Sequence, residues 1–179
     1  CNYAVFNHLA KKFEVREIES PIPLLKAVKN TTELDGFRLA CRKDGVALSK
    51  FYYWLENRLS QQPITELEAA EQLTWFRSQD KEYVSDSFGC ISAYGPNAAL
   101  PHYSATPEQQ SEIHPKGLYL VDSGAQYMHG TTDITRTMPL GELTELEKED
   151  YTLVLKGMID LSMLYFPKGS KGCNIDIVA

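Results

Sequence analysis

The sequence predicts an α+β fold in which helices are segregated from a mainly antiparallel sheet. Three segments share the pattern Thr-x-x-acid, which is typical of helix N-termini, and apolar residues recur with a period close to 3.6 after each of them. Residues 88–140 differ, because glycine and proline interrupt them often and their apolar runs are short. Short apolar runs between turn residues are typical of strands.

The N-terminal residues are expected to lie outside the main fold. Residues 1–20 resemble the tail of an upstream domain, strand-like from Phe13 to Ile18, and the chain starts with Cys1 rather than Met. Pro21 and Pro23 predict a stiff extended connector after this tail. We therefore expect a domain over residues 21–179, in a chain that is part of a longer protein.

The first predicted helix follows Thr32 and the acid Asp35 and runs for about 25 residues at the observed apolar period. Gly36 and Gly45 lie inside it. Because a glycine inside a helix costs up to about 1 kcal/mol, we expect close packing against a neighbouring segment at both positions.

The second and third predicted helices have the same start. One begins after Thr65 and runs through Phe76, and the other begins after Thr144 and continues to Pro167 and Gly169, where a helix should stop. Between these two helices the predicted strands cover about residues 88–93, 98–103, 117–122, 125–128 and 133–138.

Composition limits the classes of function. Asp and Glu number 24 against 18 Lys and Arg, so no surplus of cations exists to displace phosphate counterions, and nucleic acid is not an expected partner. No apolar stretch approaches the roughly 18 residues of a membrane span. The four cysteines are widely spaced: Cys1, Cys41, Cys90 and Cys173. They include no C-x-x-C pair, which favours free thiols in the cytoplasm over disulfides or zinc ligands.

Two carboxylates stand out in the glycine-rich region. An apolar strand ends at Asp122, and 11 residues later Asp133 opens another strand. On a helix they would lie roughly 16 Å apart. Gly124 and Gly130 instead allow the chain to fold back, so both acids can meet on one face of adjacent strands. Paired carboxylates repel unless a cation separates them, and oxygen ligands suit Mn²⁺ or Mg²⁺. The alternative is a turn cap and a surface acid.

Other residues are weaker candidates. His102 lies at the end of a short predicted strand, and it has either a catalytic role or an ordinary structural one. Ser123 lacks the G-x-S-x-G elbow, which argues against a serine hydrolase. Thr131 and Thr132 either support a neighbouring carboxylate or are turn residues.

Residues 121–127 (VDSGAQY) and 130–137 (GTTDITRT) closely resemble the first metal-binding motif of Xaa-Pro aminopeptidases, which belong to the pita-bread metallopeptidases. Three further segments agree in order and spacing: the linker and first helix from Ser20 to Gly36, Phe51–Glu56 (FYYWLE), and the stretch from Gly95 to Tyr103. The resemblance extends from about residue 18 to the C-terminus. It implies the N-terminal half of a pita-bread catalytic domain.

The resemblance also implies an activity, namely release of an N-terminal residue that precedes proline. A hydroxide held between two divalent ions, commonly Mn²⁺, would be the nucleophile, with Asp122 on one ion, Asp133 bridging both, and His102 hydrogen-bonded to the substrate. The family's other ligands, one His and two Glu, would follow Ala179, so the 179 residues alone are expected to be inactive. Expected partners are peptides with proline in the second position, and a homodimer is a candidate assembly.

Two rival functions share this fold. Prolidase cleaves Xaa-Pro dipeptides, and some pita-bread domains are non-catalytic binding modules in histone-chaperone and proliferation-associated proteins. The Pro96–Ala99 and Phe51–Glu56 segments favour the aminopeptidase over prolidase. Because binding modules are expected to lose metal ligands, the presence of both Asp122 and Asp133 favours catalysis.

Overall fold

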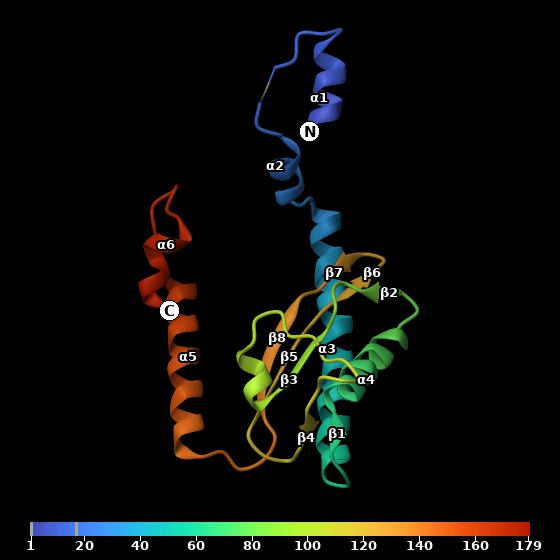
Figure 1. The fold of residues 1–179 in the computed structure, drawn as a ribbon, viewed down its shortest axis with the longest axis vertical. Coiled ribbons are helices and arrows are strands. Elements are labelled where there is room, and N and C mark those ends of the chain that lie inside the picture. Colours follow the sequence, from blue (N-terminus) through green and yellow to red (C-terminus); the bar gives the residue numbers. More distant parts are fainter. Residues whose placement is uncertain (1, 17) are drawn as a thin grey trace. The chain divides into compact units, whose positions relative to one another are not determined.

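Figure 1 shows the computed structural model, which describes residues 2–16 and 18–179. Its contacts divide the chain into two compact units, with the boundary between Asp35 and Gly36. The candidate site lies in the second unit.

The first unit begins with a helix, and the strand-like segment predicted after it is not a strand. Helix α1 (Tyr3–Ala10) begins after Asn2, whose side chain accepts a hydrogen bond from the backbone N of Val5 at 3.0 Å. Residues 13–16 and Ile18 form no strand, so the strand-like prediction is wrong for them, and Glu17 lies outside the described residues. The asparagine cap satisfies a free N–H of the first turn, which the apolar pattern alone does not reveal.

The proline pair starts a helix and is not the extended connector that was predicted. Helix α2 (Ile22–Ala27) has Pro21 as its N-cap residue and Pro23 in its first turn. Proline is tolerated there because its missing N–H would have no partner inside the helix anyway.

Helix α3 (Thr31–Leu59) confirms the long first helix but not its predicted cap. Asn30, not Thr32, forms the reciprocal capping pair: its Oδ1 accepts from the backbone N of Glu33, and the Glu33 carboxylate accepts from the backbone N of Asn30, both at 2.9 Å. Close packing is present at Gly36, where a Cβ would lie 2.3 Å from the backbone O of His129, but not at Gly45, which has open space around it.

The other two helices begin as predicted. Helix α4 (Glu66–Ser78) follows the short strand β1 (Ile64–Thr65), and helix α5 is Glu145–Met163. Both have complete capping boxes, formed by Thr65 and Thr144 respectively. Helix α5 ends earlier than predicted, because its cap residue Leu164 is already extended (ψ 132°).

The central sheet has the antiparallel order β3-β5-β8 (Figure 1), with β3 at Ile91–Tyr94, β5 at Leu118–Ser123 and β8 at Ile134–Pro139. Two smaller antiparallel sheets accompany it, one made of β2 (Tyr83–Asp86), β6 (Ala125–Tyr127) and β7 (Gly130–Thr131), the other of β1 and β4 (Glu112–Ile113).

The prediction of a strand over 98–103 is wrong. The chain there forms the 3₁₀ helix η1 (Gly95–Ala99) and a turn. Near the end of the chain lie the short helix α6 (Gly172–Ile175) and the 3₁₀ helix η2 (Asp176–Val178). Within the described residues, none of the helices combines the length and hydrophobicity needed to cross a bilayer.

The two faces of β5 have different surroundings. Tyr119 and Val121 are buried in a core with Phe51 and Leu55 of α3 and Leu73 of α4. The alternate side chains, Leu118, Leu120 and Asp122, are only partly buried, because they lie on the opposite face.

An open groove of about 680 Å³ lies on that opposite face, between the sheet and α5. Leu118, Thr135 and Thr137 line it from the strands, and Val154 and Met158 line it from α5. No side chain of α5 is buried, and several large apolar ones are exposed, among them Leu146, Leu153, Val154, Met158 and Met163.

Candidate active site

The strand register brings the two candidate acidic residues to the same end of two neighbouring strands. Asp122 of β5 pairs with Thr135 of β8, and Asp133 lies two residues before Thr135. Paired residues of antiparallel strands project to the same face, and so do residues two positions apart along a strand. Thr135 therefore shares a face with Asp122, whereas Asp133 lies one residue before β8 (Ile134–Pro139), in an irregular segment at the same end of the sheet as Asp122.

Asp122 has a buried oxygen without a partner. Its Oδ1 is inaccessible to solvent and makes no hydrogen bond with any described residue, whereas the Asp133 side chain is exposed. Burial of an unpaired carboxylate oxygen is unfavourable, and a cation at this place would compensate for it. Two hard oxygen donors suit Mg²⁺ or Mn²⁺. The described residues contain no cluster of three or more His, Cys, Asp or Glu that would complete a metal shell.

Asp122 interacts electrostatically with the thiol of Cys90. Burial raises the pKa of Cys90 to about 12, and the Asp122 carboxylate is among the smaller contributions. The thiol therefore remains protonated at neutral pH.

Gly124 brings the two acidic segments together. A Cβ at this position would lie 2.0 Å from the backbone O of Thr132 and 2.3 Å from Oγ of Ser87, so any other residue would push the segments apart. Across the turn, the backbone N of Thr132 donates to the backbone O of Ala125 at 2.8 Å. The fold-back between Asp122 and Asp133 thus depends on a glycine.

A buried ion pair supports the same turn. Nε of Arg77 donates to Oδ1 of Asp44 at 2.7 Å, and its Nη2 donates to Oδ2 of Asp44 and to Oγ of Ser123, both at 3.1 Å. Its Nη1 donates to the backbone O of Gly124 at 3.3 Å. Asp44 and Arg77 are 0% and 1% exposed. Ser123 is buried in this network, and is not placed as an exposed nucleophile.

Thr132 connects the network to the second acidic segment. Its Oγ1 donates to Oδ2 of Asp44 at 2.5 Å and accepts from the backbone N of Ala125 at 2.9 Å. Thr131, by contrast, is exposed and donates to Oε1 of Gln126. Of the two threonines considered from the sequence, Thr132 is the supporting one.

Sequence reasoning missed the Asp44–Arg77 pair, although a pattern was available. Asp44 lies four residues after Ala40 and four before Leu48, inside the buried stripe of α3. Arg77 lies four residues after Leu73, inside the buried stripe of α4. An acid and a base on two apolar stripes indicate a buried pair, because a charge is rarely buried without a partner.

His102 is not joined to the carboxylates. It is exposed, its φ of 55° is left-handed, and within the described residues no hydrogen bond or ion pair connects it to Asp122 or Asp133. Its neighbour Tyr103 is buried and donates through Oη to Oε2 of Glu66 at 2.7 Å. Burial, and to a smaller extent Glu66, raises the pKa of Tyr103 to about 12.

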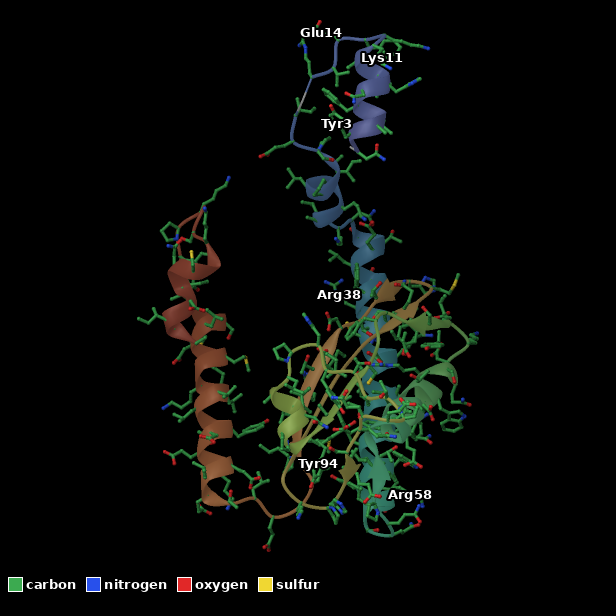
Figure 2. All side chains as sticks on the ribbon, in the orientation of Figure 1. Tyr3, Lys11, Glu14, Arg38, Arg58 and Tyr94 are labelled. Carbon is green, nitrogen blue, oxygen red and sulfur yellow. The ribbon has the colours of Figure 1, made fainter. Side chains whose placement is uncertain are left out.

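The buried Glu66 carboxylate organises the whole His102 segment. It accepts from the backbone N of Tyr94 (labelled in Figure 2) at 2.6 Å, from the backbone N of Ser111 at 2.8 Å, and from Nδ2 of Asn97 at 3.1 Å. These bonds explain why η1 replaces the predicted strand, since Asn97 must turn toward Glu66. The segment that carries His102 is thereby fixed at both ends.

Replacing Glu66 with Gln is expected to lower the free energy of unfolding by about 1–3 kcal/mol, because the amide NH₂ would face donors that now point at a carboxylate. Urea denaturation measures the loss, and faster proteolysis within residues 100–110 would report release of the His102 segment. Glu71→Gln makes the same chemical change at an exposed position of α4 and serves as the control. Equal stability of the two variants would contradict this role for Glu66.

Comparison with known proteins agrees with this architecture. The model of metallopeptidase family M24 matches residues 35–179. A probable Xaa-Pro aminopeptidase P from Paracoccidioides brasiliensis (strain Pb03) is 49% identical over 168 residues, which are 93% of this chain and 27% of that protein. A probable Xaa-Pro aminopeptidase P from Botryotinia fuckeliana is 47% identical over 181 aligned residues, covering 100% of this chain and 28% of that protein.

Solved structures show the same fold. The X-prolyl aminopeptidase of Caenorhabditis elegans, described as a cytosolic enzyme with a di-nuclear active site, superposes with a TM-score of 0.80 at 39% identity, covering 89% of this chain and 26% of that one. Prolidase from Pyrococcus furiosus superposes with a TM-score of 0.76 at 24% identity, covering 99% of this chain and 50% of that one. The chain spans about a quarter of the length of the curated relatives named above.

These matches confirm the predicted α+β pita-bread fold and the resemblance to Xaa-Pro aminopeptidases. The family match covers the sheet, both carboxylates and the buried pair behind them. The chain belongs to metallopeptidase family M24.

Proposed function

We propose that this chain is part of an aminopeptidase that releases an N-terminal residue preceding proline and uses two divalent metal ions, with Mn²⁺ as the preferred ion. The observation that carries the proposal is the buried, unpartnered oxygen of Asp122, with Asp133 just before the neighbouring strand at the same end of the sheet. The names of the relatives support the substrate class.

Asp122 and Asp133 are the proposed metal ligands in this chain. Metal ions held there would lower the pKa of a water molecule and polarise the scissile carbonyl. Asp122 lies on a strand and Asp133 directly precedes the paired strand, so the sheet limits how far the two residues must move when the ions bind. The remaining ligands, one His and two Glu, are proposed to follow Ala179 in the full-length protein.

His102 is the proposed substrate-binding and catalytic residue. Its side chain is exposed, while Glu66 holds Asn97 before it and Tyr103 after it, so the imidazole is free to meet a peptide. A hydrogen bond from His102 to the oxygen that gains charge would stabilise the transition state by a few kcal/mol, about 3 by analogy with oxyanion-hole donors.

We also propose domain boundaries for this chain. Residues 21–179 form the N-terminal half of the pita-bread domain, and residues 1–20 are the tail of an upstream domain. The exposed apolar side chains of α5 support a continuation that covers them. The proposed partners of the full-length protein are peptides with proline in the second position, and neither nucleic acid nor a membrane is a proposed partner. A homodimer is the candidate assembly. A cytoplasmic location has the support of the C. elegans enzyme.

The test is hydrolysis by the full-length protein of an Xaa-Pro-Xaa tripeptide beside an Xaa-Pro dipeptide. We expect cleavage of the tripeptide, loss of activity after removal of metal with a chelator, and recovery after addition of Mn²⁺. Cleavage of the dipeptide alone would identify a prolidase. Absence of cleavage with any peptide, in a protein that is folded and loaded with Mn²⁺, would favour a binding module.

A calorimetric titration of Mn²⁺ separates this chain from the full-length protein. Residues 1–179 supply two carboxylates and leave most coordination positions to water, so we expect weak binding and no peptidase activity. The full-length protein should bind far more tightly. Circular dichroism is used to confirm that both proteins are folded, and tight binding by residues 1–179 alone would contradict the proposed division of the metal shell.

A further inference from the structure

The buried pair Asp44–Arg77 contacts the chain directly beside both proposed metal ligands. Arg77 donates to Ser123 and Gly124, the two residues that follow Asp122. Asp44 accepts from Thr132, the residue that precedes Asp133. One ion pair therefore reaches both acidic segments, although neither Asp122 nor Asp133 takes part in it.

We infer that Asp44, Arg77 and Thr132 are positioning residues that set the separation of the Asp122 and Asp133 carboxylates and thereby tune metal affinity. This inference rests on the proposed function, because it requires that the two carboxylates bind metal. The three residues touch neither metal nor substrate and act through the backbone of the two segments.

The arrangement is suited to transmitting position and not only to stabilising the core. Asp44 comes from α3 and Arg77 from α4, and both helices are fixed by packing around Phe51, Leu55 and Leu73. The planar guanidinium makes four hydrogen bonds, two to Asp44, one to Ser123 and one to Gly124. A rigid fork of this kind holds its acceptors at set positions, which a lysine ammonium on a flexible stem does not.

Thr132 is the link through which the two segments are joined to each other. Its hydroxyl donates to Asp44 and accepts from the backbone N of Ala125, so a single oxygen bridges the α3 carboxylate and the β5–β6 turn. The backbone O of Thr132 also lies against Gly124, where an added Cβ would be only 2.0 Å from it. Loss of the hydroxyl should let the segment that carries Asp133 shift relative to Asp122.

The experiment measures Mn²⁺ affinity of the full-length protein by calorimetry, for Thr132→Val and Thr132→Ser beside the wild type. Valine keeps the shape and removes the hydroxyl, while serine keeps the hydroxyl. Removal of a group that orients metal ligands typically weakens metal binding about 10–100-fold, so we expect that loss for valine and a change under about threefold for serine. The visible spectrum of the Co²⁺-loaded protein should change for valine only.

The matched control is Tyr119→Phe. It removes a hydroxyl from another fully buried pair, the 2.7 Å contact between Tyr119 of β5 and Ser92 of β3, and leaves Ser123, Gly124 and Thr132 unchanged. We expect its Mn²⁺ affinity to stay within about threefold of the wild type. A loss equal to that of Thr132→Val would assign the effect to general destabilisation and overturn the inference.

The outcomes separate the two proposals. If the wild type does not bind Mn²⁺ tightly, the proposed function fails. If the wild type binds and Thr132→Val, folded by circular dichroism, binds equally well, the positioning role is overturned. If Thr132→Val does not fold, Arg77→Lys provides a second measurement, because it keeps the positive charge and removes the planar guanidinium. Mn²⁺ affinity and a Co²⁺ spectrum equal to those of the wild type in this variant would likewise overturn the inference.

Discussion

Replacing Asp122 with Asn in the full-length protein is expected to lower kcat/KM for an Xaa-Pro-Xaa tripeptide by at least about three orders of magnitude. The substitution preserves shape but removes the negative charge from the oxygen that is buried without a partner. A neutral amide is a poorer ligand for a divalent ion, so the metal would stabilise the transition state less, by several kcal/mol. Because about 1.4 kcal/mol is tenfold in rate, this loss corresponds to about three orders of magnitude.

Metal content distinguishes this explanation from a folding defect. Asp122→Asn and Asp133→Asn should both bind less Mn²⁺ than the wild type after dialysis, measured by elemental analysis of folded protein. Asp160→Asn makes the same change on the exposed surface of α5 and should match the wild type in activity and metal content. Activity within tenfold of the wild type in Asp122→Asn, with its metal retained, would remove Asp122 from the metal site.

Features that depend on neighbouring residues were predictable from the sequence. The capping boxes at Thr65 and Thr144 need only a residue and the acid three positions later, and both are present. Strands β5 and β8 were placed within one residue at each end, because an apolar or alternating run bounded by turn residues marks a strand locally. Gly124 and Gly130 also indicated that the chain folds back between these strands, because a tight turn depends on backbone freedom that glycine supplies locally.

Features that depend on distant residues were not predictable. Residues 98–103 look like a strand by themselves. Glu66, more than 30 residues earlier in the chain, instead accepts hydrogen bonds from Asn97 and Tyr103, and the chain between them turns. The cap of α3 was placed at Thr32 because the T-x-x-acid pattern fits there too, and the competing Asn30–Glu33 pair formed instead.

The candidate site divides in the same way. The motif and its glycines were sufficient to nominate Asp122 and Asp133. The support behind them was not visible, because Asp44 and Arg77 are 33 residues apart and meet only when α3 and α4 pack, and Thr132 lies 88 residues from Asp44. The motif therefore nominated the candidate metal ligands, whereas the packed structure was needed to find the residues that contact the chain beside them.

The second large effect is expected in stability. Arg77→Met should lower the free energy of unfolding by about 3–5 kcal/mol, because it leaves the Asp44 carboxylate buried and uncompensated, and Asp44→Leu should cost a similar amount by leaving the guanidinium unpaired. Urea denaturation of the full-length protein measures both losses. Lys148→Met, which breaks the exposed pair with Glu145 on α5, is the control and should cost no more than about 1 kcal/mol.

The double variant Asp44→Leu/Arg77→Met distinguishes an ion pair from two independent core contacts. Each single variant leaves one charge buried without its partner, whereas the double variant leaves none, so its loss should be smaller than the sum of the single losses by about 2–3 kcal/mol. Additive losses would show that the two side chains contribute by packing alone. We expect Mn²⁺ affinity to fall in the double variant even where stability recovers. Calorimetry and urea denaturation together therefore separate two roles of Asp44 and Arg77, the positioning of the carboxylates and the stabilisation of the core.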